Sequence, residues 1–206
     1  MSRATTSFQT PLSLSDRINV ALWKNALTPF FSFIGGIPAP RERVSELRYG
    51  DLKDEKLDII TPASGIPERV PVVFIHGGGR ISGSKGRFYN LPLLGLADAG
   101  HRVFSLNYPL APELPHPFAL RSLLRALVTL KSQGHLSRGM HLVGDSAGGN
   151  LAVMLGLIIK NPALLRLVDF TEPETLPQVS STNNAKRVSD LFLSVRLKYV
   201  TTSPRI

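Results

Sequence analysis

The sequence predicts an α/β fold in which helices cover both faces of a doubly wound, mostly parallel sheet. Short, continuous apolar segments, typical of strands buried on both faces, alternate along the chain with segments of helical periodicity. The chain has 206 residues, of which 43% are hydrophobic and 19% charged, and this size and composition suit one globular domain.

The strand signals begin near residue 44. Residues 44–60 alternate polar and apolar side chains around a charged turn at 51–56, which predicts two short strands. A continuous, β-branched apolar run follows at 70–75 and stops at a histidine and three glycines, which are too flexible for a strand interior. The five expected strands are 47–50, 57–60, 70–75, 102–107 and 140–143.

Three segments have the periodicity of helices. The first stops at Gly100, a glycine typical of helix C-termini, and the second places five leucines on one stripe. The third ends at the pair Asn161-Pro162. The expected helices are 88–99, 118–133 and 147–160. Because strands and helices alternate, right-handed crossovers are expected to place the helices on both faces of the sheet.

Both ends of the chain differ from this central region, so we divide the sequence into 1–43, 44–165 and 166–206. The first part is a cap-like segment in which residues 18–38 are rich in apolar side chains. Its longest uncharged run, 25–39, contains proline and glycine and is shorter than the ~20 residues that a spanning helix needs. We expect 18–38 to pack on the domain or to lie on a membrane surface as a peripheral contact, and we favour packing.

The last part, 166–206, is a divergent basic tail that follows a partial core. The chain has a net charge of +9, and residues 186–206 contribute +4, because five Lys and Arg side chains are offset by Asp190 alone. These charges do not cluster on one element with aromatic or groove-reading partners, so we interpret the tail as solvated and expect no nucleic-acid binding.

The absence of cysteine excludes disulfides, cysteine nucleophiles and thiolate metal sites. We expect no metal and no cofactor. A disulfide-stapled secreted domain has no support, and a cytoplasmic location is the interpretation we favour, while the compartment and the oligomeric state stay open.

A candidate nucleophile lies where the last expected strand meets the last expected helix. Residues 144–148 read Gly-Asp-Ser-Ala-Gly, which fits G-x-S-x-G in a strand-turn-helix context. A serine on so sharp a turn needs small neighbours, because strand and helix approach closely there, and the positive end of the helix faces the developing charge. Taken alone, the motif has a second interpretation, a glycine-rich turn that happens to hold a serine.

A second motif favours the catalytic interpretation. His76-Gly77-Gly78-Gly79 ends a strand 70 residues before Ser146, where its backbone N–H groups are expected to stabilise an oxyanion. Two such motifs, in this order and each at the carboxyl end of a buried strand, are typical of an acyl-transfer site rather than of two flexible loops.

The chain resembles the hormone-sensitive-lipase-like branch of the α/β-hydrolases, the esterases with an HGGG loop. Three segments within residues 44–165 carry the resemblance, and in the second of them Pro109 stands where arginine is usual. They are HGGGRISGSK (76–85), NYPLAPELPHPF (107–118) and VGDSAGGN (143–150). The resemblance implies a carboxylic ester hydrolase that acts on a small-molecule ester, with Ser146 as its nucleophile.

It also implies roles for the residues around the nucleophile. The backbone amides of Gly77, Gly78 and Ala147 would form the oxyanion hole. The supporting loop would comprise His76, which shapes the loop and is not a base, together with Gly79 and Asp145. Asp145 would act on the helix dipole or anchor the loop, because it adjoins the nucleophile.

One departure from the family pattern bears on activity. In this fold the acid and then the histidine of the triad follow the serine, but all five histidines precede Ser146. The family has about eight strands, whereas five are expected here. The downstream carboxylates have no convincing strand-loop context; they are Asp169, Glu172, Glu174 and Asp190. The sequence therefore predicts an ester hydrolase that is C-terminally truncated and inactive or altered, or a non-catalytic, binding or regulatory remnant of one.

Overall fold

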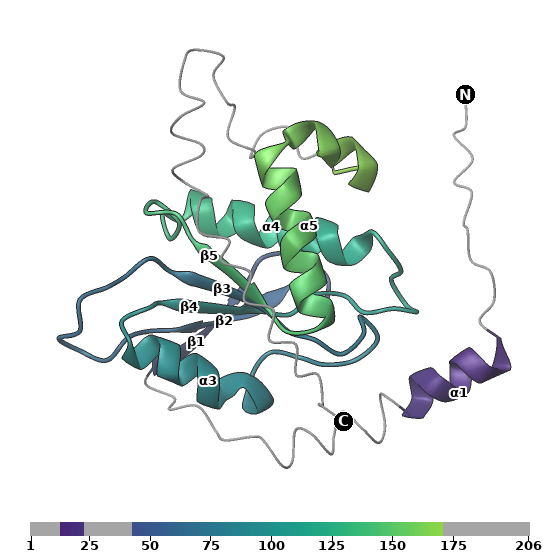
Figure 1. Cartoon of the computed structure of the whole chain (residues 1–206), viewed down its shortest axis with the longest axis horizontal. Helices are drawn as coiled ribbons and strands as arrows, with labels where there is room; N and C mark the ends of the chain where they lie inside the picture. Colours follow the sequence, from purple (N-terminus) through teal and green to yellow (C-terminus); the bar gives the residue numbers. More distant parts are fainter. Residues whose placement is uncertain (1–12, 23–42, 171–206) are drawn as a thin grey trace, which may run out of the picture.

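The computed structural model describes residues 13–22 and 43–170. In the second range, five strands form one sheet in the order β1-β2-β4-β3-β5 (Figure 1). The strands are β1 (Val44–Arg48), β2 (Lys56–Ile60), β3 (Val72–Ile75), β4 (Val103–Leu106) and β5 (His141–Gly144). Because β2 pairs antiparallel with both β1 and β4, while β3 pairs parallel with β4 and β5, β2 alone runs against the other four. The mostly parallel sheet is confirmed.

Helices cover both faces of this sheet, as the alternation of elements predicts. Alternate residues of β3 show the division: Val73 and Ile75 pack in the core cluster that includes the side chains of α4 and α5. Val72 and Phe74 pack in a second cluster with those of α3. The helices are α3 (Arg87–Asp98), α4 (Phe118–Ser132) and α5 (Ala147–Lys160), and a 3₁₀ segment, η3 (Pro162–Val168), follows α5. Every residue of β3 and β4 is buried, as strands covered on both faces require.

The first strand begins earlier than the sequence predicts. The pairing of β1 with the whole of β2 sets its limits, because Val44 lies opposite Ile60 and Arg48 lies opposite Lys56. Tyr49, predicted within the strand, instead turns inward, and its hydroxyl donates a hydrogen bond to the carbonyl of Asn107 at 2.5 Å. The buried side chain of Tyr49 therefore does not mark the end of β1, because the pairing of Arg48 with Lys56 sets that end.

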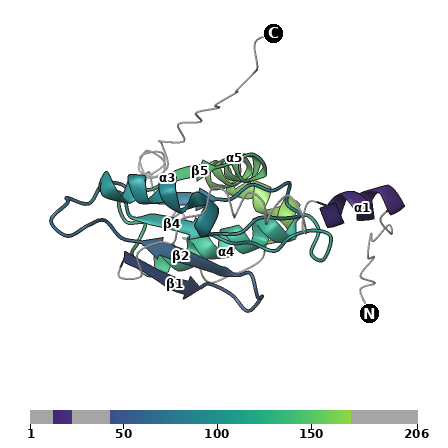
Figure 2. The same ribbon diagram turned by 90° about the horizontal axis from the view of Figure 1, so that it is seen from below.

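The N-terminal segment differs from the expectation. Its helix, α1, spans Leu14–Leu22, and residues 23–38 lie outside the described part. The apolar side chains Leu14, Ile18 and Leu22 are 72%, 59% and 52% exposed, and α1 lies apart from the sheet in both views (Figure 1, Figure 2). The expected packing on the domain is thus not found for residues 18–22. No helix in the described ranges has the length and apolar character to cross a bilayer.

Candidate active site

The strand β5 leads into α5 through a strained turn at Ser146. This serine has φ 49° and ψ −115°, in the region that favours glycine, and its neighbours Asp145 and Ala147 flank the start of the helix. A serine held in this sparsely populated conformation costs on the order of 1–3 kcal/mol, and such strain clusters at functional sites. Ser146 is exposed, so the turn presents its side chain to solvent.

Close contact explains both glycines of the G-x-S-x-G motif. A Cβ atom on Gly148 would lie 2.1 Å from the carbonyl oxygen of Ile75, and one on Gly144 would lie 2.3 Å from the backbone of Gly148. Both neighbours are backbone atoms that cannot rotate away. The helix α5 therefore approaches β3 and β5 so closely that only glycine fits at the two positions.

The His76–Gly79 loop lies beside this turn because its strand pairs with β5. Ile75 and Gly144 are opposite each other at the carboxyl ends of two parallel strands, so the loops that follow emerge at one edge. The amide of Asp145 donates to the carbonyl of Ile75 at 3.2 Å. Gly78 has φ 102°, and its carbonyl accepts from the amide of Ser82 at 3.0 Å, which closes the loop on itself.

Tyr89, on α3, connects the two loops, and the sequence did not single it out. Its hydroxyl accepts a hydrogen bond from the amide of Gly77 at 3.1 Å and donates one to Oδ2 of Asp145 at 2.9 Å. Its ring packs against Phe74, with centroids 4.8 Å apart. Burial raises the pKa of this hydroxyl, so it remains a proton donor at neutral pH. The hydrogen bond from Tyr89 to Asp145 is the kind expected if Asp145 anchors the loop.

The backbone donors of the site are not equivalent. Gly77 already donates its N–H to Tyr89. Among the described residues, the amides of Gly78 and Ala147 have no acceptor, and Ala147 is the first residue of α5, where a helix leaves its N–H groups unpaired. The N–H groups of Gly78 and Ala147 are thus available to an oxyanion. The N–H of Gly77 would first have to break its hydrogen bond with the Tyr89 hydroxyl.

His76 is a buried part of the loop. It is 1% exposed, its ring stacks on that of Tyr108 at 4.3 Å, and its Nδ1 lies 2.8 Å from the carbonyl oxygen of Gly77. The Tyr108 hydroxyl donates to the carbonyl of His76 at 2.9 Å. Burial lowers the pKa of the imidazole to about 4, so it is neutral at pH 7. These contacts fit a loop-shaping role.

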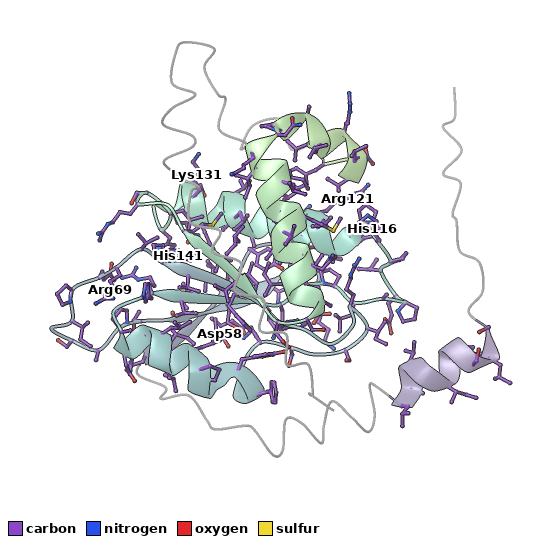
Figure 3. All side chains as sticks on the ribbon, in the orientation of Figure 1. Asp58, Arg69, His116, Arg121, Lys131 and His141 are labelled. Carbon is purple, nitrogen blue, oxygen red and sulfur yellow. The ribbon has the colours of Figure 1, made fainter. Side chains whose placement is uncertain are left out.

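Three of the other four histidines, His101, His135 and His141, lie at the opposite end of the sheet from Ser146. His141 begins β5, at the opposite end from the nucleophile turn, and its ring lies 5.8 Å from that of His101 (Figure 3). His135 packs against Phe104 at 5.2 Å, and His116 is exposed on the loop before α4. All five histidines are within the described residues, and none forms a hydrogen bond with Ser146.

The carboxylates offer no triad acid in the described part either. Asp145 is bonded to Tyr89. Asp169 is exposed and forms an ion pair with Arg121 at 3.0 Å, which fastens the end of η3 to α4. Glu172, Glu174 and Asp190 lie outside the described residues. Within residues 13–22 and 43–170, the arrangement supplies a presented hydroxyl, free amides and a helix N-terminus, and no histidine is hydrogen-bonded to the hydroxyl.

Comparison with known proteins agrees with this geometry. The family described as having the alpha/beta hydrolase fold matches residues 72–194, more than half of the chain, and the chain belongs to that family. The match continues past residue 165, where we placed the end of the core; that boundary remains a prediction.

The individual relatives include a formamidase and a lipase. Kynurenine formamidase of Danio rerio is 27% identical over 153 residues, which cover 73% of this chain and 47% of that protein. Hormone-sensitive lipase of Mus musculus is 29% identical over 73% of this chain and 21% of the lipase. The predicted resemblance to the hormone-sensitive-lipase-like branch is confirmed. The chain spans less than half the length of these two relatives.

Solved structures show the same fold. Esterase B from Lactobacillus rhamnosis matches with a TM-score of 0.63 at 23% identity, over 76% of this chain and 52% of that one. Relatives and structural neighbours of the chain thus include carboxylic ester hydrolases of the α/β-hydrolase type.

Proposed function

We propose that the chain has the nucleophile half of a serine-type carboxylic ester hydrolase, with Ser146 as the attacking group. The observation that carries this proposal is the backbone of Ser146, held at φ 49° between two glycines that no other residue can replace. A turn that only had to reverse the chain would place glycine at the strained position.

The chemistry assigned to each residue follows from its donors. The Ser146 hydroxyl would attack the ester carbonyl, and the amides of Gly78 and Ala147 would donate to the oxyanion that forms. Preorganised donors of this kind are worth about 10²–10³ in rate each. His76, Gly79 and Asp145 would hold the loop in place, with Tyr89 as the connection between Gly77 and Asp145. A small-molecule ester is the substrate class we propose.

The proton of the serine hydroxyl limits the rate. A serine without its base attacks slowly, and a triad that lacks one member reaches about 10³–10⁴ over water. Because no histidine follows Ser146, we expect this chain by itself to have at most that residual. The same observation favours the second candidate function, a non-catalytic binding or regulatory protein that retains the loops.

Hydrolysis of 4-nitrophenyl butanoate by the purified chain separates the two candidates. The hydrolase proposal expects slow turnover that is lost in Ser146→Ala. Ser137→Ala, an exposed serine between α4 and β5, is the control and should turn over like the wild type. Turnover that is equal in Ser146→Ala and the wild type, or absent from both, contradicts the hydrolase proposal and leaves the binding protein.

A further inference from the structure

Arg80, the residue after the glycine run, is fixed beside the nucleophile turn. It has φ 63°, a conformation that a non-glycine residue adopts only under constraint. Its carbonyl accepts from the amide of Ala111 at 2.8 Å, and its Nη2 donates to Oδ1 of Asn150 at 2.9 Å. Contacts from two separate segments therefore hold the backbone and the guanidinium of Arg80.

Asn150, the partner of that guanidinium, lies one helical turn after Ser146. It lies in the first turn of α5, and its backbone N–H donates to the carbonyl of Ser146 at 3.2 Å. The charge also reaches the opposite loop: burial raises the pKa of the Tyr108 hydroxyl, and the positive charge of Arg80 acts against that rise. The cation is thus held at Asn150, one helical turn from Ser146, and acts electrostatically on Tyr108.

Among the residues that the structure describes, no carboxylate forms an ion pair with Arg80. Several other arginines of the described core form ion pairs: Arg43, Arg102, Arg121 and Arg125. Arg80 forms none within the described residues, and its partner Asn150 is a neutral amide. Asp145, the carboxylate nearest in the sequence to the nucleophile, is bonded to Tyr89. A guanidinium that is oriented but unpaired has its full charge available to a ligand.

We propose that Arg80 is a specificity residue that binds a carboxylate on the substrate, so that the site prefers esters with a second, ionised carboxyl group over neutral esters of equal length. A guanidinium has five N–H donors in a planar fork that matches a carboxylate, and Asn150 takes one of them. The N-terminus of α5 adds a favourable field for an anion. The inference rests on the proposed function, because both use the Ser146 site.

The test compares two esters that differ only in this group. Monomethyl glutarate and methyl pentanoate have the same chain, with a carboxylate in the first where the second has a methyl group. Their binding to the full chain is measured by NMR titration in the Ser146→Ala background, which prevents consumption of the ester. A hydrogen bond to a charged group supports a preference of about tenfold for the glutarate ester.

Variants assign the preference to one side chain. Arg80→Gln should bind both esters about equally, while Arg80→Lys, which retains the charge, should retain part of the preference. Arg138→Gln is the matched control, because Arg138 contacts the carbonyl of Glu68 before β3, at the other end of the sheet, and it should leave the preference unchanged. The inference is overturned if the glutarate ester has no advantage, or if the advantage survives in Arg80→Gln.

The two proposals fail in different ways. An Arg80-dependent preference in binding, without Ser146-dependent turnover of either 4-nitrophenyl butanoate or mono-4-nitrophenyl glutarate, contradicts the hydrolase proposal and supports the specificity residue. Ser146-dependent turnover with the same butanoate-to-glutarate ratio in the wild type and Arg80→Gln supports the hydrolase and contradicts the specificity residue.

Discussion

Replacing Tyr89 with phenylalanine removes one hydroxyl and both hydrogen bonds that join the oxyanion loop to the nucleophile turn. The ring and its contact with Phe74 remain. Gly77 is buried, so its N–H loses its acceptor at a cost of about 1–3 kcal/mol. Asp145 is exposed and regains water, which adds less than about 1 kcal/mol. We expect Tyr89→Phe to lower the free energy of unfolding by about 2 kcal/mol.

Two measurements check this expectation. Urea denaturation gives the change in the free energy of unfolding, and hydrogen exchange followed by NMR gives the protection of the Gly77 amide. That amide should exchange faster in Tyr89→Phe by more than the global destabilisation explains, because its acceptor is gone.

Tyr49→Phe is the matched control for this prediction. It also removes a buried hydroxyl, the one that donates to the carbonyl of Asn107, and leaves Gly77 untouched. It should lower the free energy of unfolding without any selective loss of protection at Gly77. Equal stability and equal Gly77 protection in Tyr89→Phe and the wild type would refute the role of Tyr89 as the connection between the loops.

Two further predictions concern the same junction. Gly148→Ala places a Cβ 2.1 Å from the carbonyl oxygen of Ile75 and should lower the free energy of unfolding by at least about 3 kcal/mol in denaturant melts. Gly95→Ala, in open space on α3, should raise it by about 0.5–1 kcal/mol. Similar melts for both variants would contradict the close approach of Gly148 to β3. Burial lowers the pKa of His76 to about 4, so below pH 6.5 the unfolded protein binds a proton at this histidine more readily than the folded protein does. The contribution of neutral His76 to the free energy of unfolding is complete above pH 6.5. It should fall by about 3 kcal/mol as the pH drops to about 4. The free energy of unfolding, measured across this range, should depend less on pH in His76→Gln, and an unchanged pH dependence would show that His76 does not remain neutral in the fold.

The sequence by itself determined the order of the elements and the nucleophile motif. Continuous apolar strands and striped helices are local patterns, so the range of α5 was predicted to the residue, and the buried strands β3 and β4 to within two residues. The motif Gly144 to Gly148 was recognisable because a close approach of helix and strand permits few side chains. The residues under that restriction lie within five consecutive positions of the sequence.

The tertiary structure decided which distant side chains complete the site. Tyr89 and Arg80 have no distinguishing sequence pattern: their partners, Asp145 and Asn150, lie 56 and 70 positions away, and only the parallel pairing of β3 with β5 brings the two loops to one edge. The packing of α3 on β3, through the contact of Tyr89 with Phe74, gives Gly77 a hydroxyl acceptor that its sequence does not reveal. The exposed stripe of α1 is likewise a tertiary outcome, because an amphipathic pattern specifies an apolar face but does not specify what covers it.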